Sequence, residues 1–311
     1  RKPRLQAIAL FLLSFLVYAN TLGHDFALDD AIVITDNQIV QKGVAGLGEL
    51  FSHDTFYGFF MDDGKANLVA GGRYRPLTPA MFAIEQQINN GPFLPHLLNV
   101  LWYGALVLVI FGFVRDLAKT QKNLPWWFAF GVAALFAAHP LHTEAVANIK
   151  GRDEIMALLG AVGGTWLIFR AAEREHFLGA VAGAVLVFLG SLAKENAITF
   201  LAVIPVVLLL FSSKEGTSGR LKYFMPAIIG VAAFLALRSA AAGLDLSAAR
   251  CGIGDDLLHC VDAALVDERA HLARGVEAVA EFQGPGAGRE ALDEGFHEFL
   301  VHIEAVGRHA D

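Results

Sequence analysis

Residues 93–114 have the sequence FLPHLLNVLWYGALVLVIFGFV, and this stretch decides the fold class of the chain. It contains no Asp, Glu, Lys or Arg. A helix rises 1.5 Å per residue, so about 20 apolar residues cross the hydrocarbon core of a bilayer. Residues 5–22 form a second apolar run of similar length. Two such runs predict a polytopic membrane protein built from α-helices.

The composition of the whole chain supports this prediction. Of its 311 residues 55% are hydrophobic and 18% are charged, whereas a soluble domain carries about 25% charged residues. Shorter apolar segments follow, and small residues that favour close helix packing in lipid extend them at both ends. We therefore expect seven spans rather than the large buried core of a soluble helical protein, with the later five at residues 124–138, 155–169, 177–193, 197–211 and 223–237.

The basic residues that flank the apolar segments predict the orientation of the chain. Arg1, Lys2 and Arg4 precede the first segment and are expected to stay in the cytoplasm. With alternating spans, three short basic loops then face the same side, at residues 115–123, 170–176 and 212–222. The first segment also has the basic start of a signal peptide, but it lacks a small-residue cleavage site, so a retained helix is the preferred interpretation.

The composition changes near residue 240. From Leu244 onward there are 5 Arg and no Lys against 14 acidic residues, and no apolar run is long enough to span a membrane. We predict a membrane domain at residues 1–240 and an acidic segment of short amphipathic helices at 241–311, whose role the sequence does not reveal. Cys251 and Cys260 specify no fold, and the histidines of this segment match no usual metal-ligand spacing.

Four charged motifs lie on the face predicted to be opposite the basic loops. Charged residues cost several kcal/mol in hydrocarbon, so clusters of them at helix ends on one face usually mark a site. The first and second motifs are Asp29-Asp30 and Arg73-Tyr-Arg-Pro, and the third and fourth are the segment from His139 to Glu154 and Lys194-Glu195.

The first two motifs suggest acid–base and phosphate chemistry. An Asp within hydrogen-bond reach can take the proton of an acceptor hydroxyl, although Asp29-Asp30 alone also fits an ordinary acidic turn. The planar guanidinium groups of Arg73 and Arg75 suit phosphate oxygens. The alternative for this motif is an Arg–Tyr anchor at the membrane surface.

The third motif carries His139, His142 and Glu144, and it ends in a compact mixed-charge turn at residues 150–154. Its two histidines fit a metal or a phosphate, but the spacing is not that of a His-Glu-x-x-His zinc protease. The alternative is a charge-rich helix turn at the surface. In the fourth motif, Lys194 interrupts an apolar run and either neutralises a phosphate or pairs with Glu195.

Taken in order, these motifs resemble the membrane module of the transmembrane O-mannosyltransferases that carry tetratricopeptide repeats, and of their bacterial relatives, in the GT-C superfamily. The resemblance covers residues 5–240. It implies an all-α polytopic GT-C-type helix module with a large extracytoplasmic first loop. It also implies inverting transfer of a sugar, with mannose as one candidate, from a polyprenyl-phosphate donor to a Ser or Thr hydroxyl of a protein.

The resemblance also implies roles for individual residues. Asp29 or Asp30 is the expected base, with Asp30 preferred. The leaving phosphate is expected to contact Arg73, Arg75, Lys150, Arg152 and Lys194. The donor pocket is expected to include His139, His142, Glu144, Asp153, Glu154 and Glu195. We expect no required cofactor, with a divalent cation as the alternative. The expected partners are membrane lipids, the donor and an acceptor protein, but not a nucleic acid.

The chain also departs from this family. Further spans and helical pairs of about 34 residues are expected after the module, but none is visible, so we expect a truncated chain, a fusion or an altered reading frame. Two other functions remain open, a catalytically silent scaffold with an interaction tail and a lipid or solute transporter. A transporter usually carries charges near mid-membrane. Short loops and a high content of Ala and Gly favour a bacterial inner membrane over the endoplasmic reticulum, with the active site extracytoplasmic.

Overall fold

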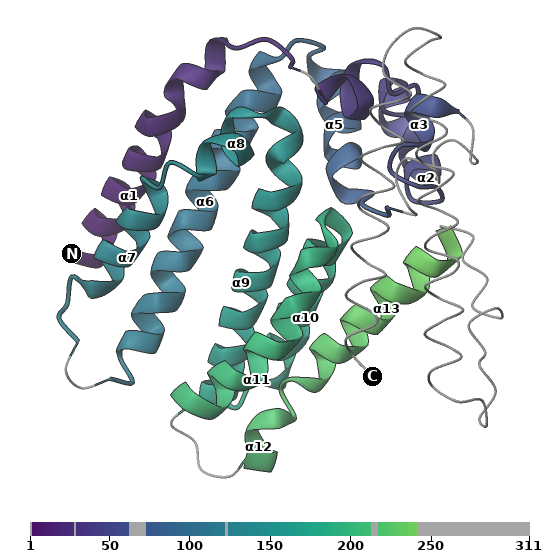
Figure 1. Cartoon of the computed structure of the whole chain (residues 1–311). Helices are drawn as coiled ribbons and strands as arrows, with labels where there is room; N and C mark the ends of the chain where they lie inside the picture. Colours follow the sequence, from purple (N-terminus) through teal and green to yellow (C-terminus); the bar gives the residue numbers. More distant parts are fainter. Residues whose placement is uncertain (1, 28, 62–72, 122–123, 213–216, 242–311) are drawn as a thin grey trace, which may run out of the picture. The chain divides into compact units, whose positions relative to one another are not determined.

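The computed structural model describes residues 2–27, 29–61, 73–121, 124–212 and 217–241, and every regular element in these ranges is a helix (Figure 1). The all-α fold class is therefore confirmed. The acidic segment predicted at residues 241–311 lies outside the described residues except for its first residue. The division of the chain near residue 240 stays a prediction.

Each of the seven predicted apolar segments forms a helix. In the part of the chain that the structure describes, three stretches are long and apolar enough to cross a membrane, namely Pro3–Gly23, Phe93–Ala118 and Ile149–Arg174, and the other four of these helices are shorter. The chain is thus a membrane protein, whereas the count of seven spans and their orientation stay predictions. The helices are α1 (Lys2–Tyr18), α6 (Phe93–Ala118), α7 (Phe128–Ala137), α9 (Arg152–Arg174), α10 (Phe177–Ala193), α11 (Phe200–Phe211) and α13 (Met225–Ala241).

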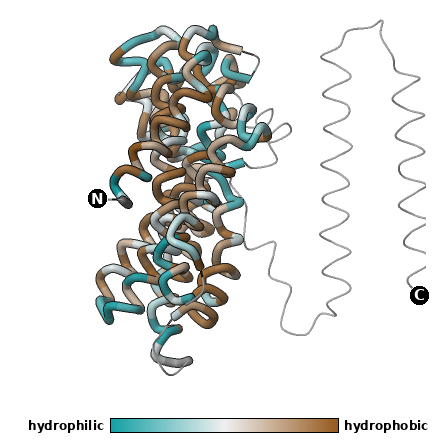
Figure 2. The backbone as a smooth tube through the Cα atoms, turned by 90° about the vertical axis from the view of Figure 1, so that its left-hand side faces the viewer, coloured by the Kyte–Doolittle hydropathy of each residue, from teal (hydrophilic) through white to brown (hydrophobic). Residues whose placement is uncertain are grey.

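Hydrophobic residues follow the long helices, and hydrophilic residues gather toward the helix ends (Figure 2). The pattern is that of helices whose middle parts lie in hydrocarbon. At 1.5 Å per residue α9 is about 35 Å long, slightly more than a hydrocarbon core of about 30 Å. A helix of this length is sufficient to reach from one membrane surface to the other.

Small residues bring α9 and α10 close together. A Cβ atom added at Gly160 would lie 2.5 Å from the carbonyl oxygen of Leu186, and one added at Gly164 would lie 2.5 Å from that of Gly183. No side chain fits at such distances, so the two backbones pack directly against each other. This agrees with the close packing expected from the small residues of these segments.

The first loop folds into short helices around its own apolar core, which includes Ile34, Ile39 and Val40. Phe82 on α5 (Leu77–Ile88) closes this core, whereas Ile88 of the same helix is 72% exposed. The described part of the loop is therefore compactly folded and is not an extended connection. Its other elements are the π-helical turn η2 (Ala31–Thr35), the 3₁₀ helix η3 (Val40–Gly46), α2 (Leu47–Leu50) and α3 (Tyr57–Phe60).

Four further short elements position the charged motifs or connect the long helices. The third charged motif forms two separate short helices before α9, because Asn148 is extended and separates α8 from η4. The short elements are α8 (His142–Ala147), the 3₁₀ helices η4 (Ile149–Gly151) and η5 (Glu195–Thr199), and α12 (Thr217–Leu221).

Candidate active site

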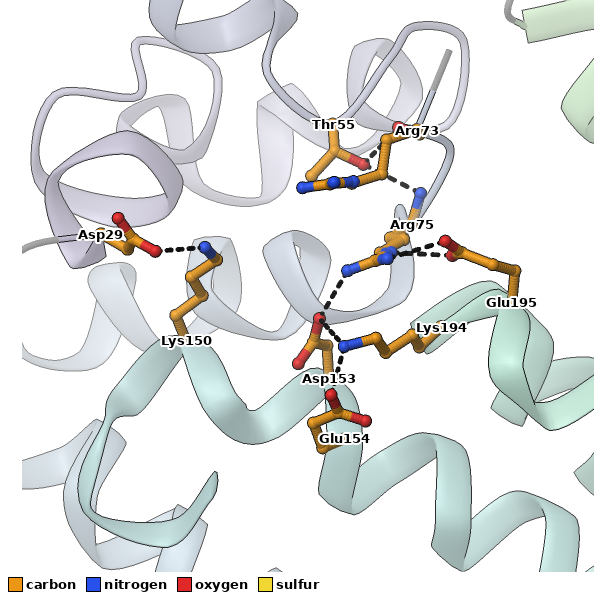
Figure 3. Close-up of polar contacts among 9 residues, drawn as sticks. All are labelled: Asp29, Thr55, Arg73, Arg75, Lys150, Asp153, Glu154, Lys194 and Glu195. Atoms are coloured by element: carbon orange, nitrogen blue, oxygen red, sulfur yellow. Dashed lines mark hydrogen bonds and ion pairs between the residues drawn. The ribbon is translucent and has the colours of Figure 1, made fainter. Parts of the chain in front are cut away.

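Three of the four charged motifs meet at the guanidinium group of Arg75. Its Nε and one terminal nitrogen donate to the two carboxylate oxygens of Glu195, at 2.8 and 2.7 Å (Figure 3). Its other terminal nitrogen donates to Asp153 at 2.9 Å. Burial opposes the charge of Arg75, but these two carboxylates outweigh it and raise the pKa of the guanidinium. Arg75 thus joins the first loop to the N-terminal end of α9 and to η5.

Lys194 adds a second link between η5 and α9. Its ammonium group contacts the carboxylate of Glu154 and lies 3.8 Å from that of Asp153 (Figure 3). The first two acids of α9 therefore bind cations from two other motifs. This placement follows helix geometry, because acidic residues are favoured in the first turn of a helix.

The first motif reaches the same place through Lys150, whose ammonium group pairs with Asp29. The Asp29 side chain is 51% exposed. Asp30 is 1% exposed, and its two oxygens accept hydrogen bonds from the backbone nitrogens of Ala27 and Lys150, at 2.9 and 3.0 Å. Burial raises the pKa of Asp30, although these two bonds act to lower it. Asp30 thus ties the first loop to η4, and Asp29 is the more accessible carboxylate.

The structure places Arg152 in the core, although the sequence suggested it as a phosphate ligand. Its side chain is fully buried and donates to Glu85, to Asn99 Oδ1 at 2.6 Å and to the carbonyl oxygen of Pro95 at 2.8 Å. The guanidinium carbon also lies 4.5 Å from the centre of the Phe82 ring. Arg152 therefore holds α9 against α5 and α6 and lines no described cavity.

A cavity of about 500 Å³ opens between these motifs. Arg73 is its one lining Lys or Arg without an ion pair among the described residues, since Arg75, Lys150 and Lys194 all contact carboxylates. The Arg73 guanidinium lies 5.5 Å from the Phe56 ring. Of the predicted site residues, the lining includes Asp29, Arg73, Arg75, His142, Glu144, Lys150, Asp153, Glu154 and Lys194.

Thr55 fixes the backbone of the second motif, a contact that no sequence pattern indicated. Its backbone nitrogen and hydroxyl donate to the carbonyl oxygen of Arg73 at 2.9 and 2.7 Å. The hydroxyl also accepts from the backbone nitrogen of Arg75 at 2.9 Å. The two arginines are therefore held in a defined position at the cavity.

An apolar groove of about 300 Å³ shares His142, Ala145 and Glu154 with the charged cavity. His142 Nδ1 lies 2.8 Å from the Tyr103 hydroxyl and 2.9 Å from the carbonyl oxygen of Phe136. The ring therefore stands at the boundary between the two spaces. The groove runs between α6, α9 and the start of α11, and its apolar lining includes Leu106, Phe136, Ile155, Leu158 and Phe200.

Two other predicted residues lie beside these spaces. His139 is exposed and accepts a hydrogen bond from the backbone nitrogen of Leu141 at 3.3 Å, but it lines neither the cavity nor the groove. Glu195 acts through Arg75. Within the described part of the chain, no three His, Cys, Asp or Glu residues are grouped so that they could hold a metal ion.

The fold and this site define a helical membrane protein with a charged cavity at its helix ends and an adjoining apolar groove. The chain is 33% identical over 204 residues to a protein O-mannosyl-transferase of Caenorhabditis elegans, which covers 65% of this chain and 27% of that protein. It is 32% identical to Protein O-mannosyl-transferase Tmtc2 of Drosophila melanogaster, over 67% of this chain and 21% of the relative. For human TMTC1 the values are 30%, 66% and 24%.

These similarities confirm the resemblance to the transmembrane O-mannosyltransferases. The chain spans only about a quarter of the length of these relatives. No family model matches the chain. No solved structure matches it either.

Proposed function

We propose that this chain is the membrane part of a GT-C-type glycosyltransferase that transfers a sugar to a Ser or Thr hydroxyl of a protein. Its relatives are named protein O-mannosyl-transferases, which supports a protein acceptor and makes mannose the first sugar to test. The observation that carries the proposal is the joining of a charged cavity to an apolar groove through His142, Ala145 and Glu154. A polyprenyl-phosphate sugar has matching charged and apolar parts.

In this proposal the donor phosphate occupies the charged cavity and the polyprenyl chain lies in the groove. Arg73 is the first phosphate ligand, because it forms no ion pair with a carboxylate among the described residues, and the charge of Asp54 acts on it only at longer range. Arg75 and Lys194 contribute fixed positive charge but are already paired with acids. Fixed donors of this kind stabilise the charge that develops on a leaving group.

Asp29 is the proposed base, in place of Asp30. Both oxygens of Asp30 are bound to backbone nitrogens and its side chain is buried, so a substrate hydroxyl has little access to it. Asp29 lines the cavity and is half exposed. Its partner Lys150 can move to the incoming phosphate, which would free the Asp29 carboxylate to accept a proton.

The proposed reaction is a single displacement. Asp29 takes the proton of the acceptor hydroxyl, and the hydroxyl oxygen forms a bond to the anomeric carbon of the sugar. The bond from that carbon to the phosphate oxygen breaks on the opposite side, so the configuration inverts. The phosphate leaves with the electron pair of the broken bond, and its negative charge faces Arg73.

We further propose that the reaction needs no cofactor, with a divalent cation between Asp29 and the phosphate as the alternative. The site would face the extracytoplasmic side, and the protein would work among membrane lipids. The relatives are animal proteins, so the comparisons give no support to the bacterial inner membrane over the endoplasmic reticulum. The described charges of the site lie at helix ends, which favours a transferase over a transporter with charges near mid-membrane.

The test is transfer of mannose from a polyprenyl-phosphate donor to a Ser/Thr peptide by the full chain in detergent, with and without a chelator. Asp29→Asn should abolish transfer and retain donor binding. Asp36→Asn is the matched control, because Asp36 is exposed on the same loop and lines no described cavity. Transfer by the Asp29→Asn variant at the wild-type rate would exclude Asp29 as the base. Wild-type protein that binds donor without transferring sugar would favour the scaffold.

A further inference from the structure

A second charged cavity, of about 610 Å³, lies at the opposite end of the membrane helices. The C-terminal ends of α6, α9 and α11 surround it. At 1.5 Å per residue, Arg170 in this cavity lies about 26 Å along α9 from Asp153 in the candidate active site. That distance is close to the thickness of a hydrocarbon core, about 30 Å. The two cavities therefore lie at opposite membrane surfaces.

The only carboxylate of α6 in this cavity, Asp116, is surrounded by donors. Lys119 donates to it at 2.6 Å and the Trp166 indole nitrogen at 2.9 Å. The guanidinium groups of Arg170 and Arg115 lie 3.7 and 3.9 Å from the same carboxylate. One negative charge thus faces three cations, which leaves positive charge uncompensated.

The α9 side of the cavity adds a further cation. Arg174 is exposed and forms no ion pair with any residue that the structure describes. Glu173 is the second acid of the cavity, and it accepts a hydrogen bond from the Ser212 hydroxyl at 2.6 Å. The cavity is thus lined by three cations, Lys119, Arg170 and Arg174, against two acids, Asp116 and Glu173, so an anion can enter without displacing an existing carboxylate.

An apolar track leads from this cavity along α11 toward the middle of the membrane. Val203, Val206 and Leu210 are 38%, 51% and 69% exposed, and Leu210 also lines the cavity. Their spacing of three and four residues places them on one face of the helix. A ligand with a charged head in the cavity thus has an apolar surface available for an acyl chain.

We propose that this cavity binds an anionic phospholipid of the membrane leaflet opposite the candidate active site. The phosphate of the headgroup contacts Lys119 and Arg174, and an acyl chain lies along Val203, Val206 and Leu210. Arg170 stays with Asp116 and lies 5.2 Å from the Trp166 ring, so it contributes fixed positive charge. Basic pockets between transmembrane helices are suited to such headgroups. The apolar track favours a lipid over free phosphate.

The test is the retention of lipid by the full chain after transfer from nanodiscs into detergent, followed by native mass spectrometry. The nanodiscs contain equal amounts of phosphatidylglycerol and phosphatidylcholine. The wild type should retain phosphatidylglycerol in preference. Lys119→Gln/Arg174→Gln should lower that retention about ten- to thirtyfold, since each basic residue near the headgroup strengthens binding. Lys42→Gln is the control for charge, because Lys42 is exposed in the first loop and paired with Glu49.

Two further measurements distinguish a phospholipid site from a site for any small anion. Leu210→Asn should weaken lipid retention, and millimolar inorganic phosphate should not compete if the acyl chain contributes. Equal retention of the two lipids by the wild type, or equal retention by wild type and double variant, would overturn the proposal. Competition by phosphate alone would also overturn it in favour of a simple anion site. Asp29→Asn should retain lipid like the wild type, so failure of the proposed enzyme activity would leave this result unaffected.

An unfolding measurement accompanies these variants. If the double variant has lost stability, Arg174→Gln replaces it, because Arg174 is exposed and its removal breaks no ion pair among the described residues. The single variant should then reduce retention of phosphatidylglycerol about fivefold and leave that of phosphatidylcholine unchanged. A reduction of both lipids to the same extent would contradict recognition of the headgroup.

Discussion

Replacing Glu85 by Gln should destabilise the protein by about 3–5 kcal/mol, because it leaves the charge of Arg152 buried without a counter-ion. The two side chains are 5% and 0% exposed. Gln keeps the volume of Glu, so the loss reports charge rather than a cavity. Asn99 and the carbonyl oxygen of Pro95 continue to accept hydrogen bonds from Arg152, but neither carries a negative charge.

The assay is a denaturant titration in detergent at pH 7, with tryptophan fluorescence as the readout. Glu49→Gln is the matched control, since Glu49 pairs with Lys42 and the two side chains are 30% and 45% exposed. Breaking such an exposed pair should cost at most about 1 kcal/mol. The double variant Glu85→Leu/Arg152→Met removes both buried charges. It should therefore lose much less stability than the sum of the losses of Glu85→Leu and Arg152→Met measured singly.

The result also separates the two roles considered for Arg152. A residue that holds helices together changes stability when its partner is altered, whereas a phosphate ligand changes donor binding. A cost below about 1 kcal/mol for Glu85→Gln, equal to that of the exposed control, would refute the buried ion pair. Wild-type stability combined with weaker donor binding would instead identify Arg152 as a phosphate ligand.

Three further predictions concern helix packing, pH and the donor site. Gly160→Leu should lower the free energy of unfolding by about 1–3 kcal/mol in the same titration, because the new side chain meets the backbone at Leu186. Gly48→Ala is the control and should lower it by less than about 1 kcal/mol, since nothing lies within 4 Å of the new Cβ. Burial raises the pKa of Asp54 from 3.8 to about 6, so the folded state binds this proton more tightly than the unfolded state. The contribution of Asp54 to stability therefore falls by up to about 3 kcal/mol as the pH rises from 4 to 6. A wild type and an Asp54→Asn variant with the same pH dependence of stability would exclude this. Arg73→Gln should weaken binding of a polyprenyl-phosphate sugar about ten- to hundredfold in a direct binding assay and leave the unfolding midpoint unchanged, and unaltered affinity would remove Arg73 from the phosphate site.

The sequence by itself determined the fold class, the positions of the seven apolar helices and the resemblance to the transmembrane O-mannosyltransferases. All of these depend on local information. An apolar run of sufficient length forms a helix in lipid whatever its neighbours are, because such a helix satisfies its own backbone hydrogen bonds. The charged motifs and their order are also identified directly from the sequence, and these motifs contribute most of the lining of the charged cavity.

Only the tertiary structure decided which member of each motif faces the cavity. Asp29 and Asp30 are neighbours, yet one is half exposed and the other is buried against two backbone nitrogens. Arg152 and Asp153 are also neighbours, but successive residues of a helix point about 100° apart. Burial thus depended on partners distant in the sequence. Arg152 forms an ion pair with Glu85, and Asp153 forms one with Arg75, and no local sequence pattern contains those pairings.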